Sequence, residues 1–216
     1  VAAQALTTAA ADIEAFLAEP WALDTTKSVK EALAAQIAVI GENMNIRRFA
    51  QMKEENGFIA SYTHMGGKIG VLVDVETDVV NDEIKEMAKN VAMQVAALKP
   101  QYTSDSEVDE SYIAHEKEIL MAQIMNDPKE SQKPEKVIQG IVTGRIKKEL
   151  KEICLLDQVY VKAEDGKQSV GAYVAQVAKA NGANITIKGF TRYETGEGIQ
   201  KKEENFAEEV AKQMGM

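Results

Sequence analysis

Few side chains in this sequence could act as nucleophiles, general bases or zinc ligands. There is one cysteine, Cys154, and there are two histidines, His64 and His115. One cysteine excludes an internal disulfide and a zinc site built on a cysteine cluster, and two distant histidines argue against a histidine-based metal site. A catalytic thiol is one interpretation of Cys154, but its apolar string Ile-Cys-Leu-Leu favours a buried structural thiol.

The sequence also lacks the common catalytic motifs. Gly67-Lys68 and Gly166-Lys167 resemble the end of a phosphate-binding loop, but Tyr62 and Val161 stand where its first glycine is required. Neither the G-x-S-x-G nor the H-E-x-x-H pattern is present. We therefore predict no catalytic residue, no cofactor and no metal, and a function exerted by binding.

Tyr62 and His64 are the first candidates for a binding role. They share one face of a predicted strand, and the turn after them contains Gly66 and Gly67, which suit tight turn geometry. His64 is either an ordinary exposed hairpin residue or a contact residue held forward by the turn. His115 falls on the apolar side of a predicted helix, which indicates a packing role.

The remaining elements follow from hydrophobic periodicity. Apolar spacing predicts a first helix that includes residue 1 and ends near Pro20. Because the sequence then begins inside a helix, we expect a trimmed chain. Thr26 is the predicted cap of the second helix, and Asn56-Gly57 is a hairpin turn signal. The predicted elements are helices at 27–40, 80–98, 107–126 and 134–152, strands near 44–52, 58–64 and 69–75, and a final helix that carries Phe206 and Val210.

An internal repeat organises the chain. At an offset of 141 residues, the string G-x-N-x-x-I-[KR]-x-F after an amphipathic helix occurs twice, from Gly41 and from Gly182. The pattern predicts an α+β fold with two related lobes, each a helix plus a three-stranded antiparallel sheet, and a helical hairpin inserted between them. The predicted units are 1–104, the hairpin 105–153 (a coiled-coil or dimerisation module), 154–200 and the C-terminal module 201–216.

Charge narrows the class of partner. The 25 Lys and Arg against 34 Asp and Glu give a net charge of −9, which argues against wrapping free nucleic acid and leaves a protein partner open. No uncharged apolar run approaches the roughly 18 residues that a membrane span requires. There is no secretory signal pattern, so a reduced, cytoplasmic compartment fits best.

Five strings in order along the chain resemble the elongation factor Ts family. Its G-E-N, Y-x-H-G-G, A-M-x-[IV]-A-A, C-L-L-x-Q and R-[FY]-x-x-G-E-G segments match nearly the whole chain, with Met65 in place of one glycine. The family's T-D-F-V motif and small N-terminal domain are expected before residue 1, and 76–80 is a degenerate copy of that motif. The matching strings are Gly41–Phe49, Ser61–Val73, Asn90–Pro100, Cys154–Gln158 and Arg192–Ile199.

The resemblance implies an exchange factor that promotes GDP release from elongation factor Tu in translation. In family terms Tyr62, His64, Gly66 and Gly67 match a hairpin tip that enters a pocket on the partner's third domain. The helix through Phe206 and Val210 matches a segment that docks on its nucleotide domain; spacing alone favours a core position for Phe206. A structural or oligomerising module, including a homodimer, and a plain α+β enzyme are the alternatives.

Overall fold

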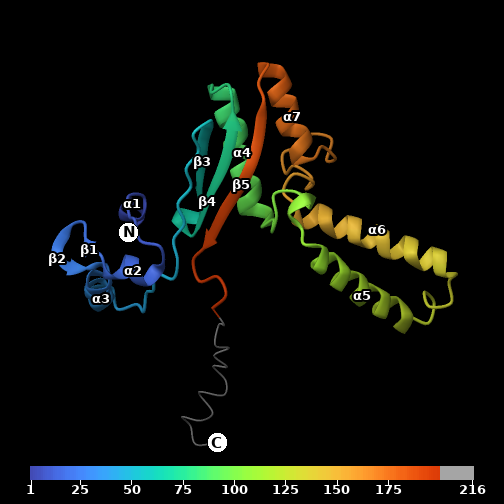
Figure 1. Cartoon of the computed structure of the whole chain (residues 1–216), viewed down its shortest axis with the longest axis horizontal. Coiled ribbons are helices and arrows are strands. Elements are labelled where there is room, and N and C mark those ends of the chain that lie inside the picture. The colour runs from blue at the N-terminus through green and yellow to red at the C-terminus, as the bar shows by residue number, and fades with distance from the viewer. Residues whose placement is uncertain (200–216) are drawn as a thin grey trace, which may run out of the picture.

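A three-stranded antiparallel sheet forms the centre of the computed structural model, which describes residues 1–199 (Figure 1). Its strand order is β3-β4-β5. β3 (Gly57–His64) joins β4 (Ile69–Thr77) through a short turn, whereas β5 (Ile185–Glu194) comes from far along the chain. The α+β class is confirmed. Within residues 1–199, however, this single three-stranded sheet takes strands from both repeats, in place of one such sheet in each lobe.

One face of this sheet carries the main core. The apolar residues at every second position of β4, from Ile69 to Val75, are buried, because alternate side chains of a strand point to the same face. α4 (Asp82–Leu98) packs across this face, and α7 (Val170–Asn181) packs against α4 and β5. Apolar side chains from both repeats therefore share one hydrophobic core.

The N-terminal segment forms a second, smaller cluster around the buried Phe16 and Val29. The predicted continuous first helix is wrong: it breaks after Ala5, Leu6 is 76% exposed, and a new helix begins at the cap Asp12. The side chain of Asp12 accepts a hydrogen bond from the Ala15 amide, which satisfies one free donor of the new helix. The elements here are α1 (Ala2–Ala5), α2 (Ile13–Ala18), β1 (Pro20–Trp21), β2 (Asp24–Ser28) and α3 (Val29–Ile40).

Ser28, not Thr26, caps α3. The Ser28 side chain accepts from the Glu31 amide and the Glu31 carboxylate accepts from the Ser28 amide, which is a complete capping box. Thr26 instead lies in β2, where its hydroxyl donates to Asp24. That bond, together with Lys27, lowers the pKa of Asp24 to about 2.

The two halves of the repeat differ in their strands. α3 and α7 each have 12 residues, a serine cap and a left-handed C-terminal glycine, Gly41 or Gly182. The segment after α7 forms β5 because β4 lies beside it. The predicted strand at 44–52 is wrong, since no strand is formed between α3 and β3. The predicted hairpin turn at Asn56-Gly57 is also wrong, because Gly57 begins β3 and Asn56 directly precedes it. The Phe49 ring lies 5.1 Å from that of Phe16 instead.

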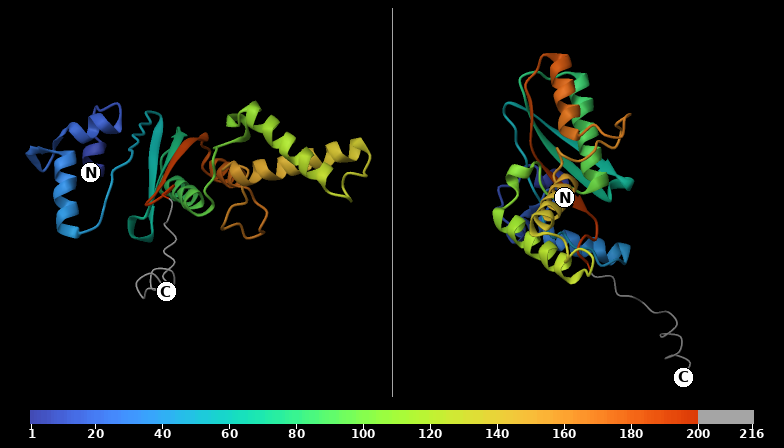
Figure 2. Two further views of the ribbon diagram at one scale, coloured as in Figure 1. Left: turned by 90° about the horizontal axis from the view of Figure 1, so that it is seen from below. Right: turned by 90° about the vertical axis from the view of Figure 1, so that its right-hand side faces the viewer.

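The predicted helical hairpin is confirmed and projects from the body (Figures 1 and 2). α5 (Glu110–Asn126) and α6 (Glu135–Ile153) pack through their own apolar seam. His115 is exposed, so its predicted packing role is wrong: two residues after Ile113, it points about 200° away from that seam residue on a helix with 3.6 residues per turn. None of the helices in residues 1–199 is long and apolar enough to cross a membrane. The seam consists of Ile124, Ile138, Val142 and Ile146, with Ile113, Leu120, Ile141 and Leu150 beside them.

The hairpin is rooted in the body by backbone pairing and by two buried amides. The short helix η2 (Asp105–Glu107) lies at the start of the hairpin. Where the chain leaves the hairpin, the Leu155 amide donates to the Tyr102 carbonyl, which lies just before η2. The Gln94 side chain of α4 donates to the Gln158 side chain at 3.1 Å, and Gln158 donates to the backbone carbonyl at the end of α6. The side-chain nitrogen and oxygen of both glutamines have hydrogen-bond partners within the chain, which keeps the base of the hairpin in place.

We expect the rest of the chain to fold without the hairpin. Replacing residues 110–150 by a flexible Gly-Ser linker removes a seam that is satisfied within the hairpin and leaves the joint intact. Unfolding by heat or urea should stay cooperative, with the melting temperature changed by a few degrees. The control carries the same linker in the loop at 127–133. Loss of a cooperative transition in the first variant alone would show that the hairpin belongs to the core.

Candidate protein-binding site

The turn between β3 and β4 has an unusual backbone. Three consecutive residues take positive φ: Met65 at 51°, Gly66 at 65° and Gly67 at 91°. A side chain disfavours this region by about 1–2 kcal/mol, whereas glycine adopts it freely. Nothing lies within 4 Å of the Cβ position at either glycine. The two glycines therefore allow the backbone geometry of this tight turn, η1 (Met65–Gly67). Met65 also lies in the turn, with 62% of its surface exposed.

Tyr62 and His64 lie side by side just before this turn. The Tyr62 hydroxyl is 2.9 Å from His64 Nδ1, and the two rings are stacked with centroids 5.9 Å apart. Tyr62 is half-buried and packs against the main core, whereas His64 is exposed. Tyr62 thus connects the exposed imidazole to the main core.

The other residues predicted from the sequence lie elsewhere. Cys154 is fully buried, and this burial raises the pKa of its thiol to about 11, so little thiolate is present at neutral pH. Asp78, in the degenerate motif copy, accepts two hydrogen bonds from Asn184, which lower the pKa of its carboxyl. They connect the segment before α4 to the residue before β5. Phe206 and Val210 fall outside the described residues.

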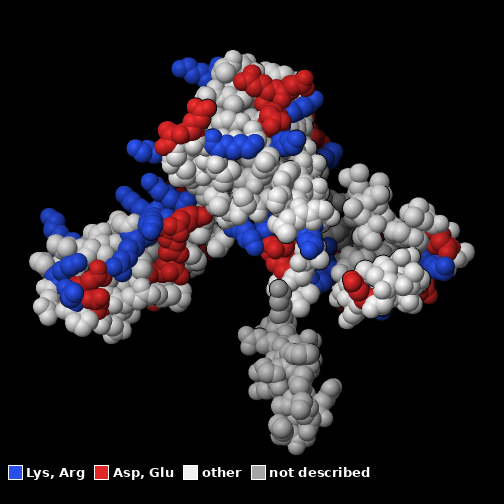
Figure 3. Space-filling view, turned by 180° about the vertical axis from the view of Figure 1, so that it is seen from behind, with Lys and Arg blue, Asp and Glu red and all other residues white. Residues whose placement is uncertain are grey.

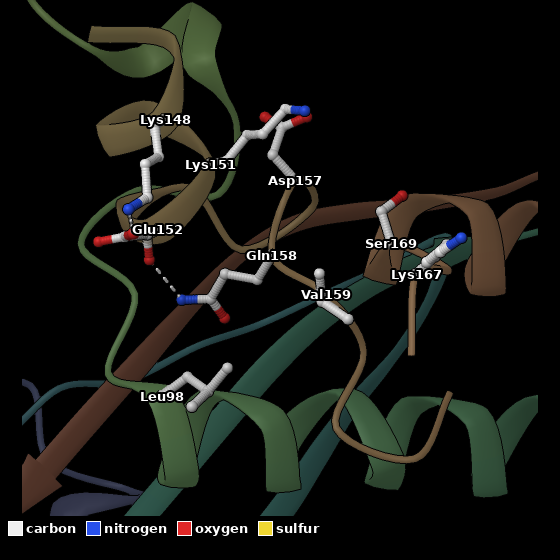
Figure 4. A pocket seen from close by; sticks show the side chains of 9 residues that line it. All are labelled: Leu98, Lys148, Lys151, Glu152, Asp157, Gln158, Val159, Lys167 and Ser169. Atoms are coloured by element: carbon white, nitrogen blue, oxygen red, sulfur yellow. Dashed lines mark hydrogen bonds and ion pairs between the residues drawn. The ribbon is translucent and has the colours of Figure 1, made fainter. Parts of the chain in front are cut away.

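A cavity of about 680 Å³ lies at the joint of the hairpin, away from the turn (Figure 4). Gln158 crosses it, and its amide donates to the Glu152 carbonyl. Its basic and acidic side chains are mixed, and Lys148 lies 3.9 Å from Glu152. Within residues 1–199, no group of three or more His, Cys, Asp or Glu side chains is placed to hold a metal ion. The lining residues are Leu98, Lys148, Lys151, Glu152, Asp157, Gln158, Val159, Lys167 and Ser169.

Comparison with known proteins agrees with the order of motifs along the chain. The family model described as elongation factor TS matches residues 1–197. Elongation factor Ts of Clostridioides difficile (strain 630) is 48% identical over 213 residues, and that of Clostridium novyi (strain NT) is 45% identical over 214 residues. Each match covers 99% of this chain and about two thirds of the relative, 67% and 68%. The chain belongs to the elongation factor Ts family.

Proposed function

We propose that this chain is a guanine nucleotide exchange factor for elongation factor Tu in translation elongation. The observation that carries the proposal is family membership along almost its whole length. The chain acts by binding the nucleotide-free partner more tightly than the GDP-bound partner. Linkage then requires that it weakens GDP binding by the same factor, and this requires no covalent chemistry.

The turn after β3 is the contact that we assign to the third domain of elongation factor Tu. This contact consists of Tyr62 and His64 at the end of β3 and of Gly66 and Gly67 in the turn. An exposed imidazole held by a half-buried tyrosine is pre-organised, so little side-chain entropy is lost when it enters a pocket. The open space around both glycines lets another protein approach the backbone closely.

We propose that four units of the chain contribute to binding elongation factor Tu: 1–104, 105–153, 154–200 and 201–216. The first and third form the sheet from which the turn projects, and the hairpin 105–153 is a coiled-coil module. The last unit carries a second contact through Phe206 and Val210. The separate apolar seam of the hairpin supports its separation from the main core.

A binding cycle tests the exchange function. The affinity of this chain is measured by titration calorimetry for GDP-bound and for nucleotide-free elongation factor Tu. The affinity of elongation factor Tu for a fluorescent GDP analogue is then measured with and without saturating chain. We expect tighter binding to the nucleotide-free form and an equal loss of GDP affinity. Equal affinity for both forms would show that the chain is a binding module without exchange activity.

The proposed second contact predicts that Phe206→Ala lowers affinity for elongation factor Tu more than it lowers stability. Phe206 and Val210 are four residues apart, and acidic residues lie between them, so one apolar stripe would face the partner. Calorimetry with the partner and thermal unfolding of the chain alone measure the two effects, with Gln213→Ala as control. A core phenylalanine would instead cost about 3–5 kcal/mol of stability, so a large fall in melting temperature with unchanged affinity contradicts this role.

A further inference from the structure

A groove lies beside the turn that follows His64. It has a volume of about 400 Å³ and lies between three chain segments: 45–48, the turn and start of β4 at 67–70, and 193–196 at the end of β5. Three of its lining side chains are basic: Arg47, Arg48 and Lys68. Glu194 is the one acidic residue that the described part of the chain contributes to this lining. We call this feature the cationic groove.

The charge excess persists when the ion pairs around the cationic groove are included. Glu194 is paired at 2.7 Å with Arg192 and at 2.9 Å with Lys99. These two cations hold the pKa of Glu194 below its ordinary value. Glu197 is paired at 2.5 Å with Arg48 and lies 3.8 Å from Arg192.

Among residues 1–199, basic side chains therefore outnumber carboxylates at this end of the sheet. The basic ones are Arg47, Arg48, Lys68, Lys99 and Arg192, and the carboxylates are Glu194 and Glu197. The chain as a whole has a net charge of −9, so the local sign is opposite to that of the protein. Figure 3 shows blue and red side chains close together where the described chain ends.

Contacts among the three wall segments hold the cationic groove together. The Arg48 guanidinium lies 4.5 Å from the centroid of the Tyr193 ring, and the Arg47 guanidinium donates to the Glu197 carbonyl. The Thr195 amide donates to the Lys68 carbonyl at 2.8 Å. Arg47 and Lys68 are exposed, and neither forms an ion pair with an acidic residue within residues 1–199. No carboxylate among the described residues neutralises these two charges, so both can act on a bound molecule.

We propose that the cationic groove binds carboxylate side chains on an acidic segment of the protein that the turn engages. This inference rests on the proposed function and adds to it a further contact, which is made by charged side chains. Gly67 belongs both to the turn and to the groove wall, and Lys68 follows it directly in that wall. A protein that binds the turn therefore also comes close to the cationic groove. Charges of this kind raise the rate of association more than they raise affinity.

The dimensions and surroundings of the groove favour protein carboxylates over nucleic acid. Binding a polyphosphate backbone requires a long basic track, whereas this groove is short and Glu194 and Glu197 interrupt its positive charge. The net charge of −9 also repels a polyanion at longer range.

Charge reversal with a matched control tests the inference. Arg47→Glu and Lys68→Glu are combined in one variant, and Lys30→Glu and Lys117→Glu, two exposed lysines elsewhere, are combined in the other. Both variants acquire the same net charge. The association rate with nucleotide-free elongation factor Tu is measured by stopped flow at low and at high salt. We expect at least a tenfold loss at low salt and a flatter salt dependence for the first variant, and rates within twofold of the parent for the control.

Several results would overturn the inference. Equal losses in both variants would mean that only net charge matters, and equal rates in both would mean that the groove takes no carboxylate. Disappearance of the difference when the chain is truncated after Ile199 would assign the groove to the chain's own last residues. Binding of a short single-stranded RNA that Arg47→Glu and Lys68→Glu abolish would assign it to nucleic acid. In each case the binding cycle tests the exchange function independently, because it requires only that the parent chain binds elongation factor Tu.

Discussion

Replacing Gly57 by alanine should destabilise the chain by about 3 kcal/mol, the upper range for overpacking at a site with no room. Gly57 opens β3 directly opposite Glu76 of β4. A Cβ atom there would overlap the carbonyl oxygen of Val75 and would lie 3.0 Å from Glu76 Cα. All of these neighbours are backbone atoms of the central strand, so no side chain can rotate away. Urea unfolding followed by circular dichroism measures the loss.

Gly70→Ala is the control for that substitution. Gly70 lies in β4, and nothing is found within 4 Å of its Cβ position. Alanine there should leave the free energy of unfolding unchanged or raise it by up to about 1 kcal/mol, since glycine weakens a strand interior. Equal effects at Gly57 and Gly70 would show that close backbone approach is not what requires glycine at the start of β3.

His64→Ala should lower affinity for elongation factor Tu by about 1–4 kcal/mol, as loss of an interface anchor does. The stability of the chain should change by only about 0.5 kcal/mol, because the side chain is exposed. An imidazole can fill apolar space and form a hydrogen bond in one pocket. Titration calorimetry with the partner and thermal unfolding of the chain alone give the two values.

Two further variants separate the imidazole from its surroundings. Thr63→Ala changes an exposed neighbour on the opposite face of β3 and should leave affinity unchanged. Tyr62→Phe removes the hydroxyl 2.9 Å from His64 Nδ1 and should weaken binding less than His64→Ala does. If His64→Ala leaves affinity intact, or shifts unfolding as much as binding, then His64 is an ordinary hairpin residue.

Local sequence patterns determined most helices and two of the three central strands. The alternation through β3 and β4 and the Met-Gly-Gly turn between them required only neighbouring residues, as did α4 and the two helices of the hairpin. The start of α3 was equally local: Ser28 with Glu31 is a capping box, and this signal identifies the cap more specifically than Thr26 does. The pairing of Tyr62 with His64 also followed from strand geometry, because residues two apart share a face.

The tertiary structure decided the elements that depend on distant partners. Residues 44–52 and β5 carry similar strings, yet only β5 is a strand, because strand hydrogen bonds require a neighbouring strand and only β5 has β4 beside it. The exposure of His115 depended on which side of α5 faces α6. The cationic groove was invisible in the sequence for the same reason. Its walls come from segments up to about 150 residues apart, and charges act through space rather than along the chain.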